Sequence, residues 1–96
     1  MTSKQRSQLK SIAMTQDAIL NIGKESLTEE FVSAADEALE ARELIKLRIL
    51  ETCPVDVKTA ANEIAQGVGA DVVQVIGSRF ILYRESKDNK TIKLVK

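Results

Sequence analysis

The spacing of apolar residues along this 96-residue chain switches repeatedly between helix period and strand period, and this alternation constrains the fold most. Three segments place apolar residues every three to four positions, as one buried helix face requires. Two of these segments are residues 3–13 and 26–42. The third is expected to begin as a helix at residues 52–54. Four short apolar or alternating runs are typical of strands: 18–22, 43–50, 72–76 and 80–84. The predicted order is α-β-α-β-α-β-β, a single compact α/β domain over residues 1–96 with helices against a four-stranded mixed sheet.

Capping and turn residues predict where these elements begin and end. The helix-start signals are two capping boxes and one proline: Thr2 with Gln5, Ser26 with Glu29, and Pro54. Gly67 and Gly69 are expected to end the third helix, and Gly77-Ser78 to join the last two strands in a tight hairpin. Residues 85–96 are polar and form either a weak edge strand or a loosely held tail.

The formal net charge is zero, but the charges are sorted along the chain. Residues 1–16 carry three basic side chains and no acidic one, residues 17–43 carry eight acidic against two basic, and residues 77–96 carry six basic against two acidic. Strand alternation points one set of side chains toward the helices: Ile45, Leu47, Val73, Val75, Phe80 and Leu82. The other face then holds Lys46, Arg48, Gln74, Arg79 and Tyr83. This predicts a basic, hydrogen-bonding surface, with an ordinary half-exposed sheet as the alternative.

A short turn between the first strand and the acidic helix has the residue types of a phosphate-holding loop. Gly23 lets a ligand approach the backbone closely, and free amides at a helix start favour an anion. Lys24 adds a positive charge, and Ser26 or Thr28 can cap the helix that follows. The alternative is a plain strand-to-helix turn with a solvated lysine.

Residue types that carry catalysis or bind metals are scarce. Cys53 is the only cysteine and the chain has no histidine, so we expect no internal disulfide, no active site, no metal site and no cofactor. Gly67 and Gly69 follow a helix, which is the reverse of the order in a dinucleotide-binding loop. No apolar run approaches the roughly 20 residues of a membrane span, and no signal core follows Met1. We therefore expect a cytoplasmic protein that binds no membrane.

Several separated segments resemble the small bacterial YhbY family, the stand-alone form of the CRM (chloroplast RNA splicing and ribosome maturation) domain. They are Thr2-x-x-Gln5-Arg6-x-x-Leu9-Lys10, Ile22-Gly23-Lys24, Ala38-Leu39-Glu40-Ala41-Arg42-Glu43-Leu44-Ile45-Lys46, Gln74-Val75-Ile76-Gly77 and Phe80-Ile81-Leu82-Tyr83-Arg84. The family's Gly-Lys-x-Gly loop, analogous to the loop of KH domains, falls on residues 23–26. Ser26 stands here in place of the second glycine, and Glu25 places a carboxylate beside Lys24.

The resemblance implies a non-catalytic RNA-binding domain that acts on ribosomal RNA during assembly of the large ribosomal subunit. It also implies a fold similar to the C-terminal domain of bacterial translation initiation factor three. We expect a monomer that binds RNA and no DNA, with contacts at Lys4, Arg6, Lys10, Gly23, Lys24, Ser26, Lys46, Arg48, Arg79 and Arg84. The alternative function is a protein-interaction module whose acidic helix, 26–42, docks on a basic partner such as a ribosomal protein.

Overall fold

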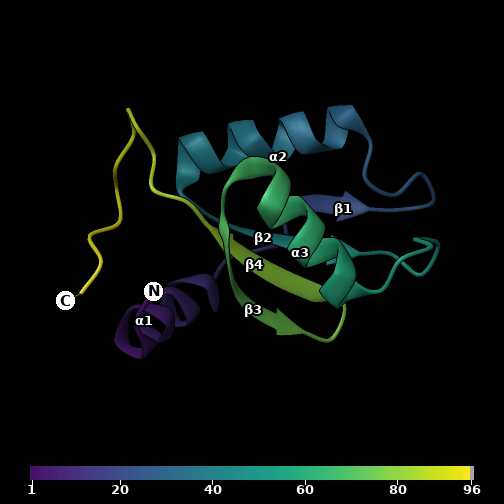
Figure 1. Ribbon diagram of the computed structural model, residues 1–96. Helices are drawn as coiled ribbons and strands as arrows, with labels where there is room; N and C mark the ends of the chain where they lie inside the picture. The colour runs from purple at the N-terminus through teal and green to yellow at the C-terminus, as the bar shows by residue number, and fades with distance from the viewer. Residues whose placement is uncertain (96) are drawn as a thin grey trace.

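The computed structural model describes residues 1–95, and its elements follow the predicted order (Figure 1). They are α1 (Ser3–Ala13), β1 (Leu20–Ile22), α2 (Glu29–Arg42), β2 (Leu44–Ile49), α3 (Val57–Val68), β3 (Asp71–Ile76) and β4 (Arg79–Tyr83). The α/β class and the α-β-α-β-α-β-β order are confirmed. Within the described residues, no helix combines the length and apolar character needed to cross a membrane.

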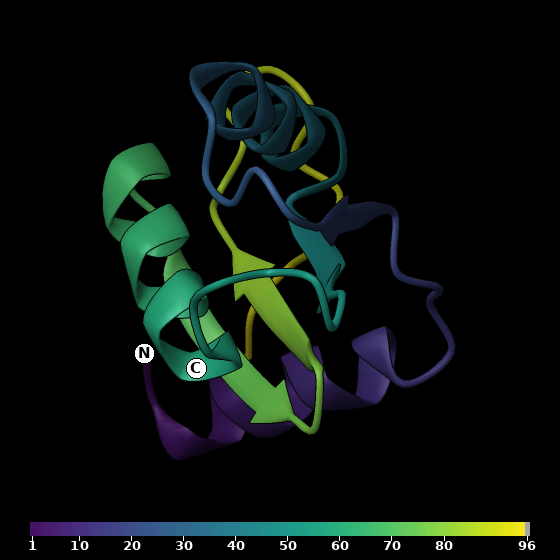
Figure 2. The same ribbon diagram turned by 90° about the vertical axis from the view of Figure 1, so that its right-hand side faces the viewer.

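The four strands form one mixed sheet in the order β1-β2-β4-β3. The outer strand β1 runs parallel to β2, with Ile22 opposite Ile49, because α2 connects them as a crossover. The pairs β2–β4 and β4–β3 are antiparallel, and the predicted Gly77-Ser78 hairpin is present with Gly77 at φ 57°. Helices α2 and α3 cover one face of the sheet, and α1 lies against the other (Figures 1 and 2).

Each face of the sheet has its own apolar core. The larger core joins α2 and α3 to the sheet, with Leu39, Leu47 and Phe80 almost fully buried. The smaller core lies under α1 and joins Leu9 and Ala13 to Leu44, Val73, Ile81 and Tyr83. The sheet is therefore covered on both faces, by α2 and α3 on one and by α1 with Ile92 and Leu94 of the C-terminal segment on the other.

An irregularity in β3 makes one predicted orientation wrong. The pairing with β4 shifts register between Val72 and Gln74, so an extra residue is inserted. Val73 consequently faces α1, and Val72 contacts the larger core in its place. Tyr83 lies on the predicted face, but it is buried there instead of contributing to an open surface.

Two predicted helix starts differ from the structure, whereas the capping box of Thr2 and Gln5 is confirmed. Helix α2 is capped by Thr28, one of the two predicted caps, whose hydroxyl accepts from the Phe31 amide at 3.1 Å, so the capping box of Ser26 and Glu29 does not form. Helix α3 begins at Val57 after Asp56, whose carboxylate accepts from the Thr59 amide at 2.7 Å. An aspartate in this extended conformation is a strong cap, and it sets the start three residues beyond the predicted 52–54 segment.

The structure also refines the predictions for the C-terminal end of α3 and for the C-terminal segment of the chain. Gly67 lies within α3, and Gly69 alone ends the helix in the left-handed conformation, at φ 67°. Residues 85–95 form no strand. This segment runs back along α1 instead, because the side chains of Gln5 and Gln8 donate to the carbonyls of Val95 and Lys93 at 2.9 and 2.8 Å.

Candidate nucleic-acid interface

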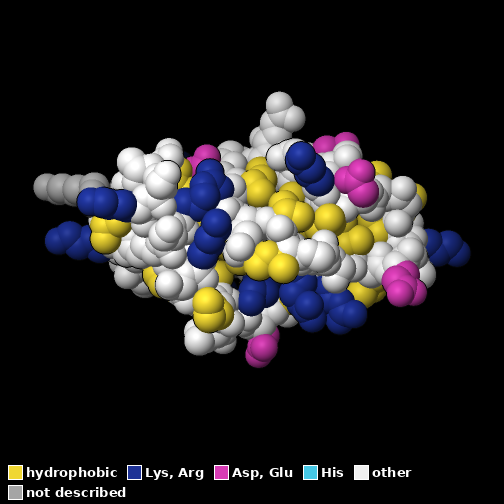
Figure 3. All heavy atoms as spheres, turned by 90° about the horizontal axis from the view of Figure 1, so that it is seen from below, with side chains coloured by type: hydrophobic (Ala, Val, Ile, Leu, Met, Phe, Trp, Pro, Cys, Tyr) yellow, Lys and Arg dark blue, Asp and Glu magenta, His cyan; other side chains and the backbone are white. Residues whose placement is uncertain are grey.

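The face of the sheet that carries α1 is only partly covered by that helix. Helix α1 packs over Leu44, Val73, Ile81 and Tyr83 and leaves the Arg48 and Arg79 end of the sheet open. Viewed from below, Lys and Arg side chains gather across this side of the molecule around exposed hydrophobic ones, and acidic side chains lie mainly toward its margins (Figure 3). The uncovered part of the face is therefore the natural place to look for a site.

Two adjoining hollows lie on this part of the face. The first, of about 400 Å³, is lined by Lys10, Met14, Lys46, Gln74, Ile76, Arg79 and Ile81. The second, of about 530 Å³, is lined by Gln16, Asp17, Ala18, Asn21, Lys46, Arg48 and Arg79. Lys46 and Arg79 line both, so the two hollows form one depression, which we call the basic groove. Its lining holds four cationic side chains and one carboxylate, that of Asp17.

Strand register brings the cations of the sheet together. Arg48 lies directly opposite Arg79 across β2 and β4, and Lys46 lies opposite Ile81, so all three basic side chains are on the α1 face. The Lys46 ammonium donates to the Gln16 carbonyl at 2.8 Å and ties β2 to the connection between α1 and β1. Within residues 1–95, neither Arg48 nor Arg79 has an ion-pair partner. Lys10, Lys46, Arg48 and Arg79 are thus predicted site residues that the fold brings together.

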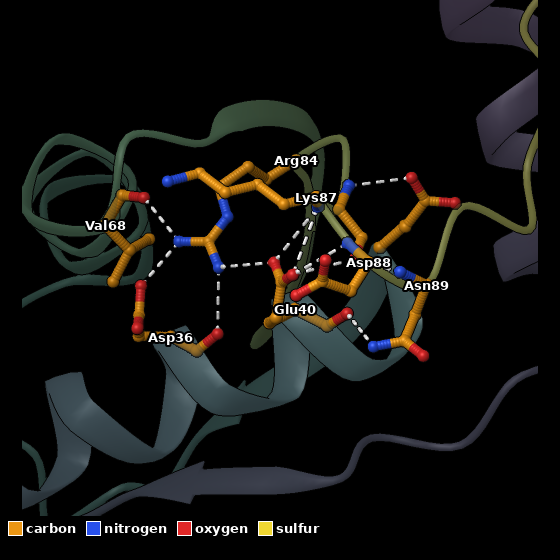
Figure 4. Close-up of polar contacts among 9 residues, drawn as sticks. Asp36, Glu40, Val68, Arg84, Lys87, Asp88 and Asn89 are labelled. Atoms are coloured by element: carbon orange, nitrogen blue, oxygen red, sulfur yellow. Dashed lines mark hydrogen bonds and ion pairs between the residues drawn. The ribbon is translucent and has the colours of Figure 1, made fainter.

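Arg6 and Arg84 are held by internal contacts. The Arg6 guanidinium donates to the carbonyls of Val72 and Val73 at 2.8 and 2.7 Å, where β3 is irregular. Arg84 lies at the other side of the sheet between α2 and α3, where it pairs with the Asp36 carboxylate and donates to the Val68 carbonyl at 2.8 Å (Figure 4). These bonds contribute to the stability of the fold, and both arginines lie outside the lining of the basic groove.

Lys4 and the loop after β1 lie outside the basic groove. Lys4 is exposed on the first turn of α1 and lines a shallow hollow with Ser7 and Ser11. Lys24 is exposed in the β1–α2 loop, at the end of β1 and away from the lining of either hollow. The structure therefore separates the predicted cations into four that line the groove, two arginines with internal partners and two outlying lysines.

The β1–α2 loop takes its shape from Ser26 more than from Gly23. Ser26 adopts the left-handed conformation, at φ 58°, and its amide donates to the Gly23 carbonyl at 3.0 Å. A Cβ atom at Gly23 would lie 3.5 Å from side-chain atoms of Leu50 and Thr52, which is ordinary van der Waals contact. The loop's own geometry does not require glycine at 23, so a need for it would have to come from a ligand.

The groove also contains side chains that sequence reasoning missed. Met14 and Ile76 are 78% and 57% exposed in the first hollow, and Asn21 enters the second opposite Arg48. Met14 follows the buried stripe of α1, and Ile76 ends an apolar strand, so each has the sequence context of a core residue. Only the assembled sheet shows that nothing in residues 1–95 covers them.

The acidic helix and Cys53, which were considered for other functions, make contacts within the fold. On the acidic helix, Asp36 and Glu40 contact Arg84, and Glu40 also accepts from the backbone of residues 87 and 88 (Figure 4). Cys53 is half-buried in a turn, and its backbone amide donates to the Leu50 carbonyl. The described part of the chain contains no group of three or more side chains positioned to hold a metal ion.

Comparisons with known proteins agree on one family. The model of the CRS1 / YhbY (CRM) domain matches residues 1–84. The chain is 39% identical over 94 residues to the Bacillus subtilis "Probable RNA-binding protein YqeI", covering 98% of each chain. It is 30% identical over 93 residues to a Pseudomonas aeruginosa "Probable RNA-binding protein", covering 96% of this chain and 89% of that one. The solution structure of a hypothetical protein from Staphylococcus aureus superimposes with a TM-score of 0.82 at 41% identity, covering 99% of both chains.

Proposed function

We propose that this chain, which belongs to the CRS1/YhbY (CRM) domain family, binds RNA and that the basic groove is the surface that contacts the RNA. The resemblance noted in the sequence is confirmed at the level of family and fold. Relatives at 39% and 30% identity are named as probable RNA-binding proteins. RNA binding is the function that this family membership and the groove support together.

The observation that carries the proposal is the pairing of Arg48 with Arg79. Like charges directly opposite one another on antiparallel strands are destabilising. These two arginines are nevertheless paired at an exposed position, with Lys46 beside them and Asp17 as the carboxylate of the groove. A polyanion in the groove would relieve this repulsion, and arginine binds phosphate oxygens in a bidentate manner.

We further propose that the RNA is ribosomal, that it belongs to large-subunit precursors, and that the protein acts in the cytoplasm without catalysing a reaction. The resemblance to the YhbY family supports this choice of target. Contacts from Lys10, Lys46, Arg48 and Arg79 to phosphates would fix the position of the domain on a folded RNA without reading its sequence. Lys4 and Lys24 extend the positive surface beyond the groove.

Filter binding to purified large-subunit ribosomal RNA tests the proposal. Each phosphate contact releases counterions, so affinity should fall steeply with salt. Arg48→Ala and Arg79→Ala should each weaken binding and reduce the slope of log affinity against log salt by about one. Lys58→Ala is the matched control, because Lys58 is exposed on α3, across the sheet from the groove.

Each of the following results would contradict part of this assignment. Absence of binding at low ionic strength would remove large-subunit ribosomal RNA as the ligand, and binding that is insensitive to salt would contradict the phosphate contacts. Equal losses for Arg79→Ala and Lys58→Ala would remove the groove as the site. If Lys24→Ala weakens binding more than Arg79→Ala does, the β1–α2 loop is the principal contact instead.

A separate experiment distinguishes RNA from the alternative of a protein partner. The tagged protein should co-sediment with large-subunit precursor particles, and ribonuclease should abolish that association. An association that survives ribonuclease would favour docking of the acidic helix α2 on a basic ribosomal protein. On that helix, the exposed carboxylates of Glu29, Glu30 and Glu37 form no ion pair within residues 1–95 and could make such a contact.

A further inference from the structure

The two most exposed large hydrophobic side chains of the described chain share one hollow. Met14 is 78% exposed just beyond α1, and Ile76 is 57% exposed at the end of β3. They come from segments 62 positions apart in the sequence, yet both line the first hollow of the basic groove. Apolar side chains that the fold gathers at the surface, and surrounds with polar ones, mark an interaction site.

Phosphate binding leaves this apolar surface without a role. Lys10 and Arg79 stand at the same hollow and are sufficient to attract a phosphate. A fully paired helix keeps its bases stacked on one another, so it has no apolar face to place against Met14 and Ile76. An unpaired nucleotide has such a face, because its base can leave the stack and rest on protein side chains.

Gln74 adds to this hollow a polar group that can form hydrogen bonds with a nucleobase. Its side chain is half-buried in the hollow, opposite Ile81 of β4, and makes no hydrogen bond within residues 1–95. A carboxamide offers both a donor and an acceptor, so it can pair with the edge of a nucleobase. The hollow's volume, about 400 Å³, falls in the roughly 300–1,000 Å³ range of small-ligand sites.

We propose that this hollow is a subsite for one unstacked nucleotide of the bound RNA. The base lies against Met14 and Ile76, the Gln74 carboxamide meets its edge, and Lys10 and Arg79 hold the adjoining phosphates. The charge around the hollow favours an RNA segment over a second copy of this chain or an uncharged apolar peptide. The inference rests on the proposed function and adds to it: the target contains an unpaired nucleotide.

The test compares three RNA hairpins. One has an uninterrupted stem, the second carries a single unpaired adenosine, and the third has an abasic nucleotide in place of that adenosine. The second and third have equal numbers of phosphates, so their difference reports the base alone. The wild-type protein should bind the adenosine hairpin at least about five-fold more tightly than the abasic one, a gain comparable with the lower end of what a base gains on an aromatic side chain.

Matched variants locate the effect. The double variant Met14→Gln with Ile76→Thr should bind both bulged hairpins with nearly the affinity that the wild type shows for the abasic one. Val75→Thr should retain the full preference, because Val75 is 38% exposed and lies opposite Phe80, on the other face of β3. All three substitutions are at exposed positions, and melting temperatures verify that the variants fold.

The results separate this inference from the proposed function. Salt-dependent binding without a preference for the adenosine, or a preference that the double variant keeps, overturns the nucleotide subsite and leaves RNA binding in place. Absence of binding to every hairpin at low salt contradicts both. A wild-type dimer in analytical ultracentrifugation that the double variant converts to monomer also overturns the inference, because the hollow would then be an interface between copies.

Discussion

At the scale of single residues, the β1–α2 loop holds its one unfavourable backbone conformation at Ser26. The left-handed conformation costs an L-residue about 1–2 kcal/mol, which glycine avoids. Ser26 nevertheless adopts it at φ 58°, and its amide and carbonyl bond to Gly23 and Thr28 at 3.0 and 3.2 Å. The loop therefore retains a shape suited to glycine at 26, although the glycine in this chain is at 23.

Replacing Ser26 by glycine should stabilise the protein. The substitution removes the steric cost of the left-handed conformation, and the added freedom of glycine in the unfolded chain offsets part of that gain. We expect the free energy of unfolding in urea to rise by about 0.5–1 kcal/mol. Gly23→Ala is the control and should change it by less than about 0.5 kcal/mol. A destabilised Ser26→Gly variant would show that the serine side chain contributes a contact that outweighs the strain.

At the scale of elements, the buried carboxylate of Glu43 joins the end of α2 to the C-terminal segment. Its oxygens accept from the backbone amides of Ser86, Thr91 and Ile92 at 2.8, 2.6 and 2.8 Å. Burial acts to raise the pKa of Glu43, but the hydrogen bonds from these three amides and the Thr91 hydroxyl hold that pKa below its ordinary value. The carboxylate that holds this segment is thus fully buried, and its buried oxygen atoms have hydrogen-bond partners.

Glu43→Gln should destabilise the protein in a pH-dependent way. The neutral carboxamide cannot accept all of these bonds, so we expect a loss of about 2–3 kcal/mol at pH 7 in chemical denaturation. Because the pKa is lowered in the folded state, the carboxylate stabilises the fold above the unfolded pKa, about 4.3 for glutamate, and loses that contribution as pH falls through the folded value.

The difference between wild type and Glu43→Gln should therefore shrink as the pH falls below about 4.3, the pKa of an unperturbed glutamate. Glu85→Gln is the surface control, because the Glu85–Lys90 pair is more than 60% exposed and contributes little. A loss for Glu43→Gln that stays constant from pH 7 to pH 3 would contradict the role of the carboxylate charge.

The elements themselves could be predicted because their signals are local. The capping box of Thr2 and Gln5 and the periodicity of α1 each depend on neighbouring residues. The register shift at Val73 and the contacts of Glu43 depend on partners that are distant in sequence. For the same reason the sequence indicated only a loose tail or an edge strand at 85–96, where the structure shows a segment that is hydrogen-bonded to the Glu43 carboxylate at residues 86, 91 and 92.

At the scale of the whole molecule, a chain of zero formal charge presents faces of different character. Lys10, Lys46, Arg48 and Arg79 line the basic groove, on the part of the sheet face that α1 leaves open. On the opposite side, the carboxylates of Asp36 and Glu40 contact Arg84. Part of the acidic surface is therefore neutralised within the protein, and the cations of the groove are left for a ligand.

The groove could be predicted from the sequence only in part. Alternation in β2 correctly placed Lys46 and Arg48 with Arg79 on one face, because strand period is a property of the sequence itself. It could not distinguish these groove cations from Arg6 and Arg84, because the carbonyls and the carboxylate that bind those two arginines reach them only when the helices pack. Met14 and Ile76 were missed because exposure of an apolar residue depends on what the fold leaves uncovered.

NMR titration of the ¹⁵N-labelled full chain shows whether RNA binds in the basic groove beside α1. The probe is the hairpin with one unpaired adenosine, added at two salt concentrations. If RNA occupies the groove, the largest amide shifts fall in residues 10–18, 46–48 and 74–79, and they weaken together at the higher salt. Shifts confined to α2, or to the β1–α2 loop with the groove unaffected, would contradict it.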